Sequence, residues 1–272
     1  MLNSLLVQKK NNFFMKPFVN SIKINHFENI SGFIHASSPR YFQNKFGEIE
    51  QYDFFSTEDL KKKCNHMKHF VKTVSIKNKI PYVLNQVHSD QVFLLKDEQK
   101  TPEQVETIKA DAIITHLPDI PIGVFTADCV PILIYDPRHR VAAAIHAGRK
   151  GTCQRIVNKV IMAMCQEYGC RPEDLVAGLG PGIGGCCYEI DETCLATFEN
   201  KIPFDPPFVQ NNGKGKFLLD LYAINTREMN ISGLFSENIF QSGECTCCSP
   251  MNFFSYRREG QTGRILTFIM MH

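Results

Sequence analysis

The strongest constraint on the fold is a run of short apolar segments in the middle of the chain, each bounded by turn residues. The segments cover residues 110–115, 122–126, 130–135 and 141–145. They are rich in valine and isoleucine, whose branched side chains favour strands. The last two segments are separated by Asp136-Pro137-Arg138-His139, a sequence typical of a tight turn. The centre of the chain therefore predicts a buried sheet that contains an antiparallel hairpin.

Strand and helix patterns alternate irregularly outside this centre. Strands are predicted at residues 81–84, 91–95, 174–180 and 264–271, and the polar residues 101–109 are predicted to form a loop. One helix is predicted from near Thr152 to Gly169, where apolar residues recur at helical spacing. Another is predicted after Asp220, because aspartate caps helix N-termini well. This mixture favours the α+β class, with mixed sheets.

Composition excludes several classes of protein. The 272 residues carry 30 Lys+Arg and 28 Asp+Glu, so the net charge of +2 argues against a dedicated nucleic-acid binder. No apolar run approaches the roughly 20 residues that span a bilayer. The first ten residues also lack the roughly 7–15 apolar residues of a secretory signal. We therefore expect a cytoplasmic protein that binds neither nucleic acid nor membrane.

Eleven cysteines are present, an odd number, and some are adjacent pairs rather than a spaced disulfide framework. In a reducing compartment we expect most of them to be buried thiols, with a minority acting as ligand or nucleophile. The segment Glu244-Cys245-Thr246-Cys247-Cys248 is a candidate second metal cluster, but we interpret its cysteines as plain thiols.

The predicted hairpin makes Cys129 and His146 the main candidates for chemistry. If the turn is symmetric, these residues lie directly opposite each other, with Cβ atoms ~4.5–5.5 Å apart. A thiolate and an imidazole at that separation either bind one metal ion or form a nucleophile–base pair. The alternative is an ordinary buried thiol beside a core histidine. Both residues lie where apolar strand meets a small-residue loop, and functional residues favour such positions.

His88, which lies between two predicted strands, is a candidate third ligand. Two histidines and one cysteine suit zinc, and catalytic zinc sites use three protein ligands. Spacing alone does not select His88 from the nine histidines of the chain. Asp111 and Asp128 are candidates to orient the ligands or to shuttle protons.

Two further segments suggest substrate contacts. Gly148-Arg149-Lys150-Gly151-Thr152 is a basic loop that runs into a predicted helix, which favours phosphate binding. Its alternative is a tight turn with two solvated cations. The glycine-rich stretch 178–185, which includes Gly182, is either a substrate-contacting loop or a structural turn. Arg257, before the last strand, is a further candidate to reach the site.

The chain resembles the YfiH-like, or laccase-domain, family of zinc-dependent purine nucleoside phosphorylases. Five motifs carry the resemblance, in the family's order: Asn85-Gln86-Val87-His88-Ser89, Thr126-Ala127-Asp128-Cys129-Val130-Pro131-Ile132, His146-Ala147-Gly148, Gly180-Pro181-Gly182-Ile183-Gly184 with Cys186-Cys187-Tyr188-Glu189, and Phe254-Ser255-Tyr256-Arg257-Arg258. The family usually has Trp-Arg after His-Ala-Gly, where this chain has Arg149-Lys150. It also usually has a Phe-x-Thr-Arg segment near the N-terminus, where this chain has residues 32–37.

The resemblance implies a single domain over residues 1–272, with layered mixed sheets flanked by helices. It implies zinc held by His88, Cys129 and His146. Together with Asp111, these three residues are our candidate catalytic residues. The implied reaction converts adenosine, inosine or guanosine and phosphate to base and ribose 1-phosphate. Adenosine deamination and methylthioadenosine cleavage are associated activities. Multicopper oxidases need several His-x-His pairs, and this chain contains none.

Two other functions remain open from the sequence. A metal-independent cysteine hydrolase would use Cys129 as nucleophile and His146 as base. A non-catalytic paralogue would bind nucleosides without turnover. The sequence does not indicate the preferred nucleoside or the oligomeric state.

Overall fold

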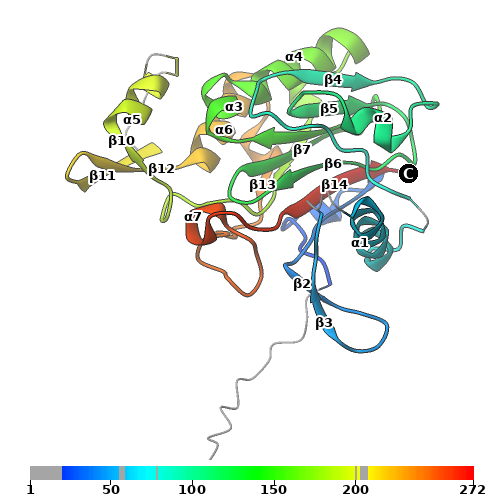
Figure 1. Cartoon of the computed structure of the whole chain (residues 1–272). Helices are drawn as coiled ribbons and strands as arrows, with labels where there is room; N and C mark the ends of the chain where they lie inside the picture. The colour runs from blue at the N-terminus through cyan, green and yellow to red at the C-terminus, as the bar shows by residue number, and fades with distance from the viewer. Residues whose placement is uncertain (1–19, 55–58, 78, 200, 203–207) are drawn as a thin grey trace, which may run out of the picture.

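The computed structural model describes residues 20–54, 59–77, 79–199, 201–202 and 208–272. Its central feature is a six-stranded mixed sheet with the strand order β13-β9-β7-β8-β5-β4. The strands are β4 (Val92–Leu95), β5 (Ala112–Thr115), β7 (Val130–Asp136), β8 (Val141–Ala147), β9 (Val176–Leu179) and β13 (Ile239–Gln241). The predicted hairpin is thus confirmed as β7 and β8, and it lies at the middle of the sheet. Figure 1 shows this sheet in the upper half of the molecule.

Helices cover one face of this large sheet. They are α3 (Arg149–Cys153), α4 (Ile156–Tyr168) and α6 (Leu221–Ile231), which pack on alternate residues of β5, β7 and β8. The predicted helix from Thr152 is interrupted because Arg155 adopts a left-handed conformation with φ 61°. Gly169 ends α4 in the left-handed conformation, and the Asp220 carboxylate accepts the Ala223 N–H at the start of α6. Both predicted helix caps are therefore confirmed.

A second, three-stranded sheet packs on the opposite face, with the order β1-β14-β6. Its strands are β1 (Phe33–Ser37), β6 (Ile122–Thr126) and β14 (Ile265–Met271). The outer face of this sheet is covered by α1 (Leu60–Thr73), as Figure 1 shows at the lower right. The layers are therefore helix, six-stranded sheet, three-stranded sheet and helix. The predicted α+β class with layered mixed sheets and flanking helices is confirmed.

Smaller elements lie at the margins of these layers. They are the hairpin β2 (Tyr41–Gln43) and β3 (Ile49–Gln51), the sheet of β10 (Glu189–Asp191), β12 (Lys216–Leu219) and β11 (Val209–Gly213), the helices α2 (Pro102–Glu106), α5 (Glu192–Glu199) and α7 (Tyr256–Glu259), and 3-10 turns at 27–29, 172–174 and 236–238.

Two predictions for this region were wrong. Residues 81–84 form no strand. Tyr82 makes an isolated bridge with Ile122, and the pairing does not extend because each partner is preceded by a proline, Pro81 or Pro121. Residues 101–109 contain helix α2, because Thr101 and Gln104 form a reciprocal capping box around Pro102.

No helix within the described residues is long and apolar enough to cross a bilayer.

Candidate active site

Three side chains meet where β7 begins and β8 ends. They are His88, Cys129 and His146, hereafter the trio, and their ligand atoms lie within 4.8 Å of one another. The rings of His88 and His146 are nearly perpendicular, with centroids 4.8 Å apart. His146 is buried in the sheet, Cys129 is half-buried and His88 is exposed. The structure therefore brings together the three residues that the sequence suggested.

The strand register that produces this meeting differs from the predicted one. His146 lies opposite Pro131, two residues beyond the expected partner Cys129. The reason is that Asp136 pairs with Val141 as the last residue of β7, and its carboxylate accepts the N–H groups of Arg138 and His139, so the four-residue turn is shifted by one residue to 137–140. Cys129 still lies near His146, because residues two apart share one face of a strand and form a diagonal pair.

Asp111 fixes the position of His88. Its carboxylate accepts the backbone N–H groups of Val87, His88 and Ser89 at 3.3, 2.9 and 2.6 Å, and the Ser89 hydroxyl at 2.7 Å. These bonds hold the turn at residues 87–89, in which His88 has a left-handed φ of 58°. A non-glycine residue seldom adopts this conformation, so the turn depends on the surrounding bonds.

The same carboxylate orients His146. Oδ1 of Asp111 lies 2.7 Å from Nδ1 of His146, so Nδ1 carries the proton and Nε2 is left for another partner. Burial alone would raise the pKa of Asp111, but the hydrogen bonds from His146 and Ser89 outweigh it and hold this pKa at about 2. Asp111 is therefore a charged, fully buried acceptor that links two members of the trio.

Within the trio, Cys129 and His146 favour each other's charged forms. Burial raises the pKa of the Cys129 thiol, but the neighbouring His146 and His88 outweigh burial and lower it to about 6. Burial lowers the pKa of His146, but the Cys129 thiolate and Asp111 outweigh burial and raise it to about 9. The thiolate is the form in which Cys129 binds a metal, and His146 would release its Nε2 proton on binding.

The side chains of Cys129 and His88 lie so close to Gly148 that a larger residue there would meet them. A Cβ atom on Gly148 would lie 2.8 Å from Sγ of Cys129 and 3.2 Å from Cδ2 of His88. The donor set of two imidazoles and one thiolate fits zinc, and the carboxylate on Nδ1 of His146 is the partner that zinc-binding histidines usually have. The trio thus has the ligands and the support of a three-residue zinc site.

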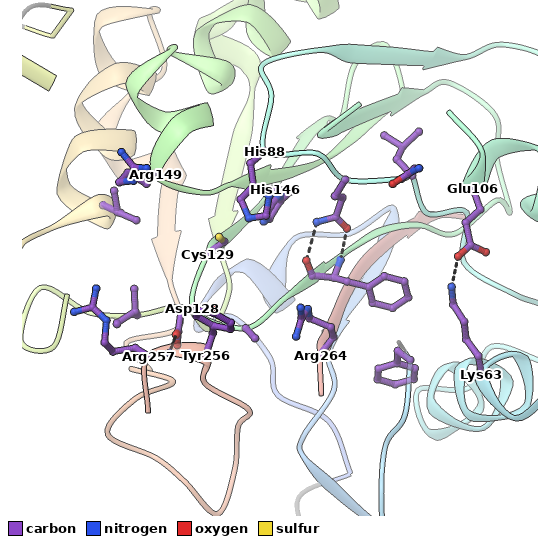
Figure 2. A pocket seen from close by; sticks show the side chains of 18 of the residues that line it. Lys63, His88, Glu106, Asp128, Cys129, His146, Arg149, Tyr256, Arg257 and Arg264 are labelled. Atoms are coloured by element: carbon purple, nitrogen blue, oxygen red, sulfur yellow. Dashed lines mark hydrogen bonds and ion pairs between the residues drawn. The ribbon is translucent and has the colours of Figure 1, made fainter. Parts of the chain in front are cut away.

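The trio lies on the wall of a cavity of about 850 Å³, within the usual range for small-molecule sites. Figure 2 shows the trio at the centre, with side chains from several distant elements around it. Besides the trio, the cavity is lined by Phe54, Leu60, Lys63, Leu84, Asn85, Gln86, Glu106, Phe125, Ala127, Asp128, Arg149, Ile183, Tyr188, Leu221, Tyr256, Arg257 and Arg264.

Three arginines give this cavity a positive wall. Arg149 begins helix α3, directly after the loop that follows His146, and Arg257 lies over the ring of Tyr188 at 5.1 Å. Arg264 lies directly before β14, and burial lowers the pKa of its guanidinium. Arginine suits planar recognition of phosphate and carboxylate groups. The cavity is therefore suited to a ligand with an anionic part and an aromatic part.

Asp128 connects this wall to the trio. Its φ of 98° is unusual for a residue other than glycine. Its carboxylate accepts the Thr246 hydroxyl at 2.7 Å and the Arg257 backbone N–H at 2.6 Å. Asp128 thus ties helix α7 and the loop before it to the residue that precedes Cys129.

Two of the seven predicted substrate-binding residues, Arg149 and Arg257, line the cavity in the part of the chain that the structure describes. Lys150 is exposed away from the lining, and the buried hydroxyl of Thr152 accepts a hydrogen bond from α6. Gly148, Gly151 and Gly182 allow close backbone approach instead: a Cβ on Gly182 would lie 3.1 Å from the carbonyl oxygens of Asp128 and Cys129.

Several cavity residues escaped the sequence reasoning. Lys63 and Glu106 form an ion pair at the far end of the cavity, and they come from helices α1 and α2. No local signal distinguishes them from ordinary surface charges. Tyr188, Tyr256 and Arg264 lie within or a few residues after motifs that the sequence analysis quoted. Their closeness to those motifs was the one sequence feature that could have indicated them.

Comparison with known proteins identifies the family and the fold. A family model described as multi-copper polyphenol oxidoreductase laccase matches residues 50–272. The solved structure of the hypothetical protein YfiH of Bacillus licheniformis superposes with a TM-score of 0.81, covers 93% of this chain and 97% of that one, and is 23% identical. That similarity supports the fold described above.

Two sequence relatives have names that state an activity. A purine nucleoside phosphorylase of Clostridium acetobutylicum is 38% identical over 192 residues, which are 69% of this chain and 75% of the relative. The adenosine deaminase RL5 of an unknown prokaryotic organism is 34% identical over 190 residues, which are 68% of this chain and 72% of the relative.

Proposed function

The chain belongs to the multi-copper polyphenol oxidoreductase laccase family, and we propose that it is a zinc-dependent purine nucleoside phosphorylase. Its substrates would be adenosine, inosine or guanosine together with phosphate, and its products the base and ribose 1-phosphate. Adenosine deamination and methylthioadenosine cleavage are proposed as side activities of the same site. The observation that carries the proposal is the position of the trio on the wall of a cavity with three arginines.

His88, Cys129 and His146 would hold the zinc ion. When bound, zinc supplies an electrophilic centre that polarises an oxygen atom of the substrate or of water. Asp111 keeps the proton on Nδ1 of His146 and keeps the turn that carries His88 in place. Its role is to position the ligands, because the carboxylate is fully buried behind them.

The cavity provides for both parts of the substrate. Arg149 and Arg257 would bind phosphate, and Tyr188 and Phe125 present aromatic surface to the purine. In phosphorolysis a phosphate oxygen forms a bond to C1′ of the ribose while the bond from C1′ to the purine nitrogen breaks. The departing base takes the electron pair of the broken bond and, in the balance, the proton that the attacking hydrogen phosphate gives up. Cationic side chains help by holding the phosphate in line with this bond.

A metal-independent cysteine hydrolase is the second candidate function. The ion pair between Cys129 and His146 favours it, because a thiolate with a lowered pKa is a nucleophile near neutral pH. In that case Cys129 would attack the substrate directly and a chelator would have no effect.

We also propose that residues 1–272 act as one domain with purine nucleosides and phosphate as partners. A cytoplasmic location is part of the same proposal.

The test is to purify the chain without added metal, measure zinc, and assay ribose 1-phosphate release from adenosine and inosine with phosphate. Activity should require zinc and should be lost in Cys129→Ala, while Cys165→Ala, a half-buried cysteine of helix α4, keeps it. Hydrolytic activity that survives chelation and is lost in Cys129→Ala would favour the hydrolase. Nucleoside binding without any product would favour a non-catalytic paralogue.

A further inference from the structure

A second group of cysteines gathers away from the trio. Cys186 and Cys187 follow the glycine-rich loop after β9, and Cys245 and Cys248 lie in the loop after β13. Their four sulfur atoms lie within 4.8 Å of one another. These residues are called the thiol cluster below. Two loops therefore meet that are 61 to 62 residues apart in sequence, counted between the cysteines whose sulfurs are in contact.

Three sulfur–sulfur separations in the cluster are close to those of a tetrahedral metal site. Sγ of Cys186 lies 3.7 Å from Sγ of Cys187 and 3.7 Å from Sγ of Cys248, and Sγ of Cys187 lies 3.3 Å from Sγ of Cys248. Zinc–sulfur bonds of about 2.3 Å in a tetrahedron place the sulfurs about 3.8 Å apart. A disulfide would instead need about 2.0 Å. The four cysteines are free thiols in the structure.

The backbone of the two loops is arranged to support these sulfurs. The Gly184 N–H donates to Sγ of Cys245 at 3.3 Å, which stabilises a thiolate. A Cβ on Gly184 would lie 3.2 Å from Sγ of Cys186, so glycine permits the approach. Gly182 forms an isolated parallel bridge with Cys245, and the Thr246 N–H donates to the Gly182 carbonyl at 2.9 Å. The loops are thus bonded to each other around the cluster.

The spacing of the cysteines also fits a metal site. Cys245 and Cys248 have the C-x-x-C spacing of zinc-binding loops, although Cys247 between them obscures it. This corrects the interpretation of residues 244–248 as plain thiols without a specific ligand spacing. The remaining two ligands, Cys186 and Cys187, are adjacent in sequence.

Two arginine side chains bind the backbone of the loops that carry the cluster, and Arg258 also forms an ion pair with Glu259. Arg257 donates to the Cys187 carbonyl at 3.3 Å. Arg258 donates to the carbonyls of Thr246 and Cys247 at 2.6 and 2.9 Å. Both guanidinium groups are therefore fixed beside the two loops that carry the cluster.

We propose that the thiol cluster is a second, structural zinc site with four cysteine ligands. On binding, the four thiols release their protons to solvent and all four positions around the ion are filled by sulfur. The site has no open position for substrate. It joins the loop that carries Tyr188 to the loop that precedes Arg257, and both of these residues line the cavity. The second zinc would thus hold one wall of the cavity in place.

The test counts zinc ions in the full chain purified under reducing conditions without added metal. The wild type should hold about two zinc ions per chain, and Cys245→Ser/Cys248→Ser and Cys129→Ala/His146→Ala should each hold about one. Cys247→Ser is the matched control, because Cys247 lies in the same loop outside the cluster, and it should keep both ions. X-ray absorption of the Cys129→Ala/His146→Ala variant should show only sulfur ligands at about 2.3 Å.

Several outcomes would overturn this proposal without touching the function proposed for the trio. One is a folded Cys129→Ala/His146→Ala variant, checked by circular dichroism, that contains no zinc. Another is a disulfide between Cys187 and Cys248, found by mass spectrometry in the wild type purified under reducing conditions. Iron in place of the second zinc would overturn the choice of metal. Conversely, zinc that is lost only through the thiol-cluster variant would support this site and refute zinc binding by the trio.

Discussion

Asparagine in place of Asp111 is the smallest change that tests how the trio is held together. The carboxylate accepts five hydrogen bonds, two on Oδ1 from His88 and His146 and three on Oδ2 from Val87 and Ser89. An asparagine amide has nearly the same shape but offers only one oxygen. Its NH₂ group would therefore face donors that need an acceptor.

The magnitude follows from those donors. Leaving one buried donor without an acceptor costs about 1–3 kcal/mol, and the amide leaves at least two donors facing its NH₂ group, so we expect Asp111→Asn to lower the free energy of unfolding by at least about 2 kcal/mol. The distorted turn also displaces His88 from His146. Loss of a partner that orients a metal ligand typically weakens metal binding by about 10–100-fold, and we expect this loss at the trio.

The assay is a titration of zinc against a competing chelator in a Cys245→Ser/Cys248→Ser background, where the trio is the remaining proposed site. Urea denaturation gives the change in stability. Asp136→Asn is the matched control, because Asp136 is also fully buried and also accepts two backbone N–H groups and a histidine Nδ1. It should lower stability and leave zinc affinity unchanged. Equal zinc affinity in Asp111→Asn and wild type would refute the positioning role of Asp111.

Three further predictions concern other residues. Gly148→Ala should abolish zinc binding at the trio while the chain stays folded, because the new methyl group would meet Sγ of Cys129 at 2.8 Å; zinc content and circular dichroism check this, and an unchanged zinc content would contradict it. Arg149→Ala should raise the KM for phosphate about 10-fold, whereas Lys150→Ala, on the exposed neighbour, should leave it within about 2-fold; equal effects would argue against Arg149 as a phosphate ligand. Burial, assisted by nearby Lys23, lowers the pKa of His35 to about 3, while Nε2 accepts the Ile24 N–H at 3.0 Å. In the unfolded chain His35 binds a proton below about pH 6.5, whereas in the folded chain it stays neutral down to about pH 3. The stabilisation that neutral His35 provides should therefore be fully present above about pH 6.5. The free energy of unfolding should fall by up to about 1.4 kcal/mol per pH unit between about pH 6.5 and about pH 3. His35→Gln should flatten that part of the profile in urea denaturation, and an unchanged slope would refute the assignment.

The hairpin β7–β8 could be predicted from the sequence because its strands are unbroken apolar runs around a turn. Its register could not, since the side chain of Asp136 decides where the strand ends. The proximity of Cys129 and His146 did not depend on that detail, because a shift of two residues keeps both side chains on one face.

The remaining parts of the site depend on contacts between distant segments. The bond from Asp111 to the turn at His88 and the ion pair between Lys63 and Glu106 join elements that no local pattern connects. Two members of the thiol cluster, Cys245 and Cys248, could be predicted from their C-x-x-C spacing. The other two, Cys186 and Cys187, lie on another loop, and the sequence does not show that the loops meet. Motifs shared with a family located these loops without showing how they meet.

Strand β14 has a consequence for how the protein is made. It is the central strand of its sheet and pairs on one side with β1, where Phe33 faces Met271, and on the other with β6. During translation, β1 and β6 leave the ribosome long before β14, the strand that pairs with both. Until β14 is made, the edges of β1 and β6 that it will cover have unpaired backbone N–H and C=O groups. Contacts so remote in sequence slow folding and leave such edges open to association with other chains. We therefore expect chaperones to matter most for this protein in the interval before β14 leaves the ribosome.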